Sequence, residues 1–417
     1  MSLFRFATSE LLSTFFPTWL WQGKQWLKGK VPSYDPYYWG NAHAHPVLST
    51  YYPPAIALSY ISSLVKIDTA FHCLVSSLFL HYCLAFCGWF ILIRNFSGNW
   101  CIDAFGAFTI TFGAYALKQQ PCIIYTLAWF PLTLYQDPVL SALALGMMLL
   151  AGYYPFSIYL IPISVVAHIL WYSEAWLLMG IIIGLPQIVP FLCHLPKTIK
   201  RLDDKCQSPE VERRFYVGVI PILLLPFSTS RIWPITLLSC LFSLGLFKSF
   251  FPRVHERWLI VIQFGIGWMS VSALNNLNLN HQTLYLLVVL HAFDIFWHNR
   301  ECLPPRPYCE LWQRPSRVFN TQLTRYLKAN LGSFKVSGLP WPLFTGHVNE
   351  IKTIGYCGSM QEKSMWAWRK SFRHDPFIDG VKDDELTKHG IRFAYSRKRP
   401  VGWLKTPIKH LYRNPVL

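Results

Sequence analysis

Charged residues are scarce in this chain of 417 residues, because Asp, Glu, Lys and Arg make up only 14% of it. Soluble globular proteins have about 25%. Negative charge is the scarcer of the two: the 21 acidic residues stand against 38 basic residues, which gives a net charge of +17. This composition excludes an ordinary soluble protein, and the 53% of hydrophobic residues exclude disorder over most of the chain. No nucleic-acid-binding motif accompanies the positive charge, so we expect no nucleic-acid partner.

The eleven cysteines include no CxxC pair, and no Cys/His spacing matches a closed zinc site. The sequence therefore supports neither a disulfide framework nor a structural metal. Most of the cysteines lie inside or beside apolar runs, where we interpret them as small core residues.

Apolar and aromatic residues are abundant instead. Aromatic residues make up 17% of the chain, which is typical of proteins whose membrane spans end in aromatic anchors. Eleven apolar runs follow one another over residues 50–297, and several are shorter than the span of roughly 20 residues that crosses a bilayer without tilt. We therefore predict a mainly α fold, a polytopic transmembrane helical bundle of about 10–12 helices with the bilayer as its partner.

The C-terminal part, residues 298–417, has a different composition. Residues 300–417 hold 21 Lys or Arg and 9 Asp or Glu. Short patches at 333–339, 351–355 and 390–395 are bounded by Gly and Pro, which is typical of short strands. We predict a small, basic α+β globular extension after the multispan domain.

Loop charge predicts the orientation, because Lys and Arg concentrate in cytoplasmic loops. With eleven alternating spans, one side collects Lys66, Lys118 and the six basic residues between Lys197 and Arg214. This bias predicts that the first segment and the loop at 275–282 are extracytoplasmic, and that the C-terminal extension is cytoplasmic.

The first segment, residues 1–49, has no uninterrupted apolar run long enough to span a membrane. Residues 11–27 predict a helix that lies in the interface plane, and a turn-rich stretch follows it. The segment contains Glu10, Asp35, His43 and His45. Carboxylates and imidazoles together can act as a general base or bind a metal. The alternative is that the two histidines form hydrogen bonds at the membrane surface.

Acids next to the apolar runs need a partner, because charge close to lipid is costly. These acids are Asp68, Asp103, Glu174 and Asp294. We expect them to cap helices or to pair with a neighbouring base. His291 lies three residues before Asp294 on the same helix face, with His298 further along, and a metal or proton-relay role is the alternative there.

Residues 9–58 combine an acid, a short aromatic helix, a Gly/Pro turn that contains Asp35, and a span that opens with YYPP. This arrangement resembles the first outer loop of the bacterial YfhO-type membrane proteins, which belong to the GT-C superfamily of lipid-linked-sugar glycosyltransferases. Residues 112–135 and 151–163 are similar to that family's middle spans. Residues 324–360 are similar to the globular part that follows its last core spans.

The resemblance implies a bacterial inner-membrane enzyme that transfers sugar from a polyprenyl-phosphate donor to a cell-envelope acceptor. Glu10 falls where the family usually has an Asp that acts as base or binds metal and acceptor, and Asp35 is the second candidate. The resemblance leaves the cofactor open, with a divalent cation as one candidate. The family normally begins with a span before this loop, where this chain has residues 3–21, so a degenerate, inactive relative is an alternative. The resemblance also implies that the globular part lies outside the cytoplasm, against the loop-charge prediction.

Transfer from a polyprenyl phosphate needs basic side chains or a cation at the leaving phosphate. The residues expected to bind the substrate are Lys24, Lys28, Lys30, His43, His45, Tyr51, Tyr52 and Arg94. The three lysines can equally bind anionic lipid head groups. The rival hypothesis is a non-enzymatic membrane transporter or assembly scaffold, in which the acids pair internally. The sequence leaves the oligomeric state open.

Overall fold

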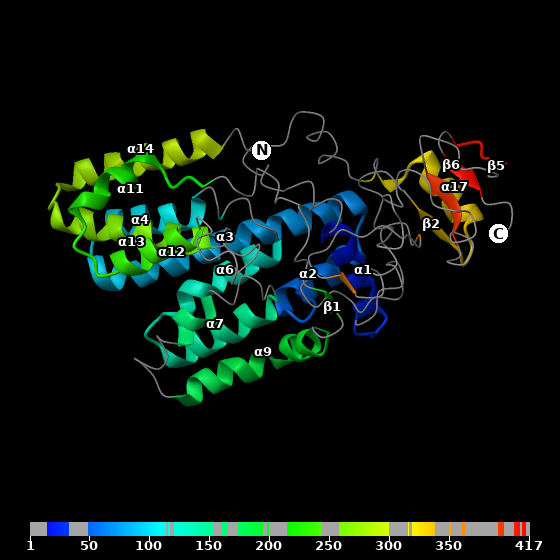
Figure 1. Cartoon of the computed structure of the whole chain (residues 1–417), viewed down its shortest axis with the longest axis horizontal. Helices are drawn as coiled ribbons and strands as arrows, with labels where there is room; N and C mark the ends of the chain where they lie inside the picture. The colour runs from blue at the N-terminus through cyan, green and yellow to red at the C-terminus, as the bar shows by residue number, and fades with distance from the viewer. Residues whose placement is uncertain are drawn as a thin grey trace.

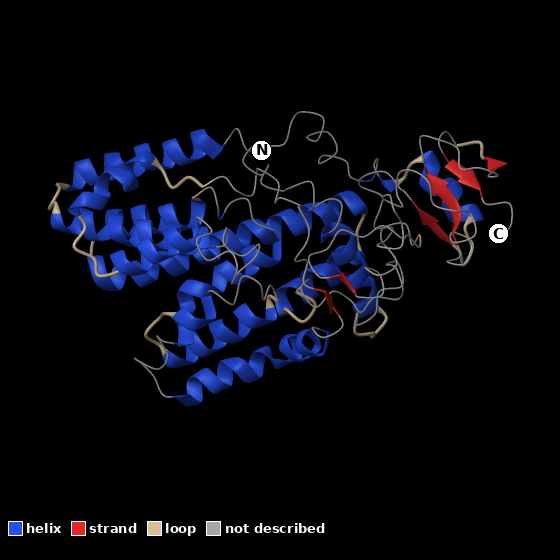
Figure 2. Ribbon diagram, viewed as in Figure 1, coloured by secondary structure: helices blue, strands red, loops and turns tan. Residues whose placement is uncertain are grey.

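The computed structural model describes residues 15–32, 49–113, 116, 121–152, 160–165, 174–194, 198–199, 215–243, 258–299, 316, 319–337, 351, 361–362, 391–395, 404–408 and 411–413. These residues are mainly helical, as predicted (Figure 2). The helices are α1 (Phe16–Leu27), α2 (Pro53–Ser63), α3 (Ile67–Ser97), α4 (Trp100–Phe112), α6 (Pro121–Thr133), α7 (Pro138–Leu150), α9 (Glu174–His194), α11 (Val219–Leu224), η4 (Leu225–Phe227), α12 (Trp233–Ser243), α13 (Leu259–Asn276), α14 (His281–Asn299) and α17 (Gln322–Asn330). The strands are β1 (Thr198–Ile199), β2 (Lys335–Ser337), β3 (Gln361–Glu362), β4 (Ile391–Tyr395), β5 (Leu404–Lys405) and β6 (Leu411–Arg413).

Helix α3 is the longest of the described helices and runs along the bundle (Figure 1). It has 31 residues, which at 1.5 Å per residue gives a length of about 46 Å. It ends at Gly98, whose φ of 69° is the left-handed conformation that glycine adopts at helix ends. We call the end of the bundle where α3 begins the proximal end, and the end where it finishes the distal end.

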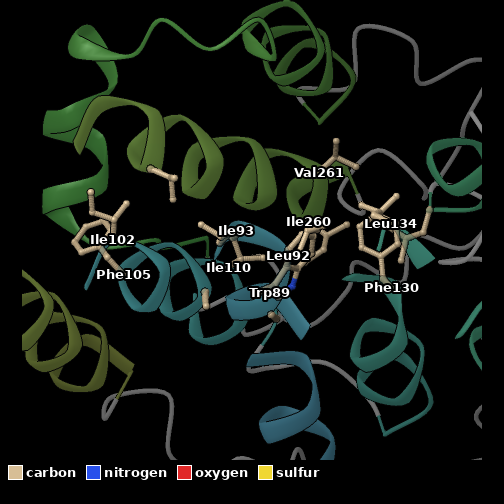
Figure 3. Close-up of a cluster of buried hydrophobic side chains, with 14 of the residues drawn as sticks. Trp89, Leu92, Ile93, Ile102, Phe105, Ile110, Phe130, Leu134, Ile260 and Val261 are labelled. Atoms are coloured by element: carbon tan, nitrogen blue, oxygen red, sulfur yellow. The ribbon is translucent and has the colours of Figure 1, made fainter. Parts of the chain in front are cut away.

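Helix α4 packs on α3 toward the distal end, and α13 and α14 pack on α4. The Asn99 side chain caps α4 by accepting from the Cys101 N–H, and Cys101 Sγ lies 3.4 Å from His281 Nδ1 at the start of α14. Helices α4 and α13 approach closely at Gly106, where a Cβ atom would lie 2.4 Å from Val271 Cγ2. A core of buried apolar side chains from α3, α4, α6 and α13 fills this half (Figure 3).

Helices α7 and α9 run parallel and pack through small residues. A Cβ atom at Gly180 would lie 2.9 Å from the carbonyl oxygen of Ala142, and one at Gly184 would lie 2.6 Å from Leu149 Cβ. Gly146 of α7 is equally close to Ile183. Small residues of this kind let two helix backbones approach within a membrane, where no hydrophobic effect drives helices together.

Helix α1 packs into the bundle. All eight residues from Phe16 to Gly23 are buried, and a Cβ atom at Gly23 would lie 2.0 Å from the carbonyl oxygen of Ser59 in α2. Phe16 packs edge-on against Phe71 near the start of α3. Protein therefore covers much of this segment, and its position at a membrane interface stays a prediction.

The C-terminal extension contains the predicted strands at 333–339 and 390–395, which form β2 and β4. The patch at 351–355 falls outside the described residues except for Ile351. The four-stranded sheet has the order β2-β4-β6-β5, with β2 parallel to β4 and the other pairs antiparallel. Helix α17 covers it, and Tyr326 packs edge-on against Phe393.

Three contacts hold the C-terminal extension at the proximal end (Figure 1). Asp68, in the first turn of α3, accepts hydrogen bonds from the backbone N–H and the hydroxyl of Ser316, at 2.8 and 2.7 Å. The ring of Phe319 lies 6.1 Å from that of Phe16. Strand β1, which follows α9, pairs antiparallel with β3.

These contacts place several segments along the axis of the bundle. Helix α1, the residues after α9 and the C-terminal extension share the proximal end. The turn between α13 and α14 lies at the distal end, because His281 contacts Trp100 and Cys101 at the start of α4. Helix α1 and this turn therefore lie at opposite ends of the bundle. The side of a membrane that each end faces, and the alternation of eleven spans, stay predictions.

Two of the described helices, α3 and α13, are long and apolar enough to cross a membrane. The shorter apolar stretches are Trp100–Phe112, Ile123–Thr133, Pro138–Leu150 and Ala175–Pro190. A mainly helical chain with two such helices is the part of the fold-class prediction that the structure confirms.

We predict that Gly180→Ala destabilises the bundle by about 1–3 kcal/mol, because the added methyl group forces α9 away from the Ala142 carbonyl. Thermal unfolding of the purified protein in detergent micelles measures the effect. Ile182→Ala, on the exposed side of the same helix, is the control and should change the unfolding temperature less. Equal effects of the two substitutions would contradict close packing at Gly180.

Candidate functional site

Four of the predicted site residues, Glu10, Asp35, His43 and His45, lie outside the described residues. The structure does describe the chain on both sides of residues 33–48. Helix α1 and residues 28–32 come before this stretch, and Ser49 and the start of α2 follow it. The described part of the candidate site therefore consists of the residues on either side of this stretch.

The segment Ser49–Tyr52, which leads into α2, is held by three other helices. The Ser49 hydroxyl donates to the carbonyl of Ala151 at the end of α7, at 2.5 Å. The Tyr51 N–H donates to Gln187 Oε1 of α9 at 3.1 Å, and Gln22 of α1 donates to the Thr50 hydroxyl at 3.0 Å. Ser49 has a φ of 54°, a left-handed conformation that a non-glycine residue keeps only when its surroundings impose it.

The hydroxyl of Tyr52 is the centre of a buried network between α2, α3 and α6. It lies 2.6 Å from His81 Nε2, and Trp129 Nε1 donates to it at 2.6 Å. His81 Nδ1 lies 2.6 Å from the Ser77 carbonyl, which can only accept, so Nδ1 carries the proton. Nε2 therefore accepts from the Tyr52 hydroxyl. Every polar atom of this chain of hydrogen bonds has a partner, which makes such a network rigid.

Tyr52 is fully buried, so the structure gives this predicted substrate-binding residue a place in the core. Its contact with a substrate stays a prediction. Sequence reasoning missed His81 and Trp129, which complete the network. His81 lies within an apolar run, and this position could have indicated a buried hydrogen bond, because a buried imidazole needs a polar partner.

Lys24, Lys28 and Lys30 come together at the C-terminal end of α1. Lys28 and Lys30 are exposed, while Lys24 is half-buried in the last turn. Cations are favourable there because the helix dipole places partial negative charge at a C-terminus. These lysines directly precede residues 33–48, so they are suitably placed to attract an anion near that stretch.

Arg94 is not part of this lysine group. It lies near the distal end of α3 and forms an ion pair with Asp103 of α4, with Nη1 and Oδ2 3.2 Å apart. Asp103 is fully buried and also accepts from the Ser97 hydroxyl. Arg94 and the lysines lie toward opposite ends of α3, so one phosphate cannot contact both. The predicted grouping of Arg94 with the lysines is therefore wrong.

The other acids beside the apolar runs follow the expectation that they find partners. Asp103 pairs with a base, whereas Asp68 accepts from Ser316. Asp294 accepts from the Tyr216 hydroxyl and from the Val219 N–H at 2.9 Å. Glu174 begins α9, but its side chain lies outside the described part of the structure. Hydrogen bonds to Asp68, Asp103 and Asp294 offset the desolvation of these three carboxylates, which explains how they lie next to apolar helices.

A small cavity lies beside the Tyr52 network. It has a volume of about 30 Å³ and is bordered by His81, Tyr82, Trp89, Thr111 and Phe264 among other, mostly apolar residues. This volume is more than the roughly 10–15 Å³ that one water molecule needs. The lining is mostly apolar, so we do not assign the substrate to it.

Among the described residues, no three His, Cys, Asp or Glu side chains gather into a metal-binding group. The predicted divalent cation therefore stays a prediction, since Glu10 and Asp35 fall outside that part of the chain. No family model and no curated protein matches the sequence.

We predict that Tyr52→Phe lowers the free energy of unfolding by about 1–3 kcal/mol, because Trp129 Nε1 loses its buried acceptor and His81 Nε2 loses its donor. Tyr60→Phe removes the same hydroxyl from an exposed side chain of α2 and serves as the control. Thermal unfolding in detergent compares the two variants. A loss no larger for Tyr52→Phe than for Tyr60→Phe would show that the network adds nothing to stability.

Proposed function

We propose that this chain is a multi-pass membrane protein whose helical bundle lies in the bilayer. The observation that carries the proposal is a set of exposed apolar side chains repeated at helical spacing. On α9 they are Leu178, Ile181, Ile182, Leu185, Val189 and Leu192, and on α14 they are Tyr285, Leu286, Val289, Leu290, Phe293, Phe296 and Trp297. Exposed apolar patches of this extent mark a surface that water does not cover.

Helices α9 and α14 lie at opposite edges of the bundle in the view of Figure 1. Apolar side chains therefore face outward on both edges, while polar groups such as the Tyr52 network are buried inside. Lipid as the surrounding solvent accounts for both facts, since a helix satisfies its own backbone and needs no polar outer surface there.

The first test is extraction of membranes from expressing cells. We predict that the protein stays in the membrane pellet after alkaline carbonate treatment and dissolves only in detergent, because apolar helix faces hold it in lipid. A peripheral membrane protein in the same sample is the control and should be released by carbonate. Release of this protein into the carbonate supernatant would reject integration into the bilayer.

We further propose that the protein is a GT-C-type glycosyltransferase of the bacterial inner membrane. It would transfer sugar from a polyprenyl-phosphate donor to a cell-envelope acceptor. The support is the resemblance of residues 9–58 to the YfhO-type outer loop, together with the anchoring of Ser49–Tyr52 by α1, α7 and α9. A fixed span entry restricts where the preceding residues can go, as catalysis by positioning requires.

In this proposal each group has one task. Glu10, or Asp35 as second candidate, takes the proton from the acceptor hydroxyl as it attacks the sugar carbon. Lys24, Lys28 and Lys30 stabilise the charge on the leaving polyprenyl phosphate. A divalent cation held by the carboxylates would assist at the same phosphate.

We predict that Glu10→Gln or Asp35→Asn lowers sugar transfer by at least about 100-fold, because an amide cannot accept the proton. Transfer is measured in membrane vesicles supplied with a polyprenyl-phosphate sugar, by mass spectrometry of the acceptor fraction. Asp137→Asn is the matched control, because Asn can still accept from the Leu140 N–H that Asp137 caps. Full transfer by both variants at normal expression would reject the catalytic assignment.

A non-enzymatic membrane transporter or scaffold is the second candidate. The observation in its favour is that Asp68, Asp103 and Asp294 are all engaged by neighbouring groups of the chain. Solute flux in reconstituted vesicles, together with no sugar transfer by the wild type, would favour this candidate over the enzyme. The absence of sugar transfer without any flux would instead fit a degenerate relative that has lost the transferase activity.

A further inference from the structure

Helix α3 has a stripe of exposed side chains along its outer face. Successive positions of this α3 stripe are adjacent or lie three, four or seven residues apart, which keeps them on one face of the helix. In order they are Thr69, His72, Ser76, Phe79, Leu80, Cys87, Ile91, Arg94 and Asn95. Every residue of α3 is described, so the stripe can be followed without a gap.

The chemistry of the α3 stripe changes twice along the helix. The stripe is polar up to Ser76, and from Phe79 to Ile91 every exposed side chain is apolar or a thiol. It becomes polar again at Arg94. Because the face of the helix stays the same, the surroundings of the helix must change along its axis. The 18 residues from Ser76 to Arg94 correspond to about 27 Å.

Helix α14 shows the same pattern. Gln282 and His298 are exposed, and every exposed side chain between them is apolar or aromatic. Tyr285 and Trp297 lie near the two ends of this apolar part, as amphipathic aromatic side chains do at the boundaries of a membrane. The 16 residues from Gln282 to His298 correspond to about 24 Å.

The apolar parts of α3 and α14 end at the same level on the distal side. Arg94 pairs with Asp103 in the first turn of α4. His281, next to Gln282, contacts Trp100 at the start of the same helix. Both polar boundaries therefore lie beside the beginning of α4.

They also end at a similar level on the proximal side. The ring of Phe296 lies 6.3 Å from that of Phe112, which in turn lies 6.2 Å from that of Tyr82 in α3. Phe296 and Tyr82 are therefore at similar levels of the bundle. His298 follows Phe296 by two residues, and Phe79 precedes Tyr82 by three, so both lie within one turn of this level on the proximal side.

Helix α9 covers the same levels. The Tyr51 N–H donates to Gln187, and the next residue, Tyr52, bonds to His81 of α3, so Gln187 lies near the level of His81. The exposed apolar side chains of α9 fall within Leu178–Leu192. This range extends nine residues from Gln187 on one side and five on the other, much as the apolar part of α3 extends from His81.

We infer that lipid chains contact the bundle along a single belt, which is bounded on α3 by Ser76 and Arg94. The inference rests on the proposed position of the bundle in the bilayer and adds where the hydrocarbon begins and ends. The height of this lipid belt is close to the roughly 30 Å of a bilayer core. The first three turns of α3 then project beyond the hydrocarbon, where the exposed imidazole of His72 meets water or head groups. They carry the C-terminal extension through the contact of Asp68 with Ser316.

The test is thiol labelling of the full-length protein in phosphatidylcholine nanodiscs, which leave both membrane faces open, with a charged, water-soluble maleimide. The variants His72→Cys, Ser76→Cys, Leu80→Cys and Ile91→Cys place a thiol at four positions of the α3 stripe. Mass spectrometry of the peptides quantifies each thiol separately from the native cysteines. We expect the first two variants to label at least about 10-fold faster than the last two, because the reactive thiolate does not form in hydrocarbon. All four should label alike after denaturation in SDS.

The wild type offers the same comparison without any substitution. Cys73 and Cys83 are both half-buried on α3, and Cys87 is exposed. Cys73 lies on the proximal side of the lipid belt, whereas the other two lie within it. Cys73 should therefore label faster than Cys83, and also faster than the more exposed Cys87.

The outcomes separate this inference from the proposed membrane location. Equal labelling of Ser76→Cys and Leu80→Cys would overturn the boundary between them. Protection at all four positions would also overturn it, while the bundle would still lie in lipid. Rapid labelling of Leu80→Cys, Ile91→Cys and Cys87 would overturn the lipid belt and reject integration into the bilayer as well.

Discussion

Burial of the Tyr52 hydroxyl between α2, α3 and α6 is the constraint on which the proximal half of the bundle depends. The hydroxyl satisfies Trp129 and His81 at once, and His81 in turn satisfies the Ser77 carbonyl. No member can leave without exposing an unpaired polar group to an apolar core. Because Tyr52 follows the anchored residues Ser49, Thr50 and Tyr51, the network also fixes where α2 begins.

Glycines allow other helices of the bundle to pack closely against each other. Gly106 lets α4 and α13 approach, and Gly180 and Gly184 let α7 and α9 approach. In each pair the backbone of one helix comes close to atoms of the other. The exposed faces of α9 and α14 are apolar by contrast. Apolar side chains therefore lie both in the core between the helices and on these outward faces, while the Tyr52 network is a buried polar exception.

Several features were predictable from sequence because they depend on local composition or spacing. The helical class follows from the long apolar runs, and β4 was visible as a short alternating patch between Gly and Pro. The kind of partner that Asp103 has, a neighbouring base, was predictable, since a carboxylate beside an apolar run must be neutralised. The burial of α1 was not predictable, because its few polar residues resemble those of an interfacial helix. Only the contacts of Phe16 and Gly23 with α2 and α3 decided it.

The sequence by itself determined that the chain is helical, strongly apolar and basic at its C-terminal end, and it singled out the acids and histidines that need partners. Tertiary structure alone decided which groups meet. It separated Arg94 from the lysines of α1, brought the C-terminal extension to the start of α3, and placed Gly218 against His291. The reason is that these contacts join residues far apart in the chain. Periodicity reports which face of a helix is apolar, but not which other helix will cover it.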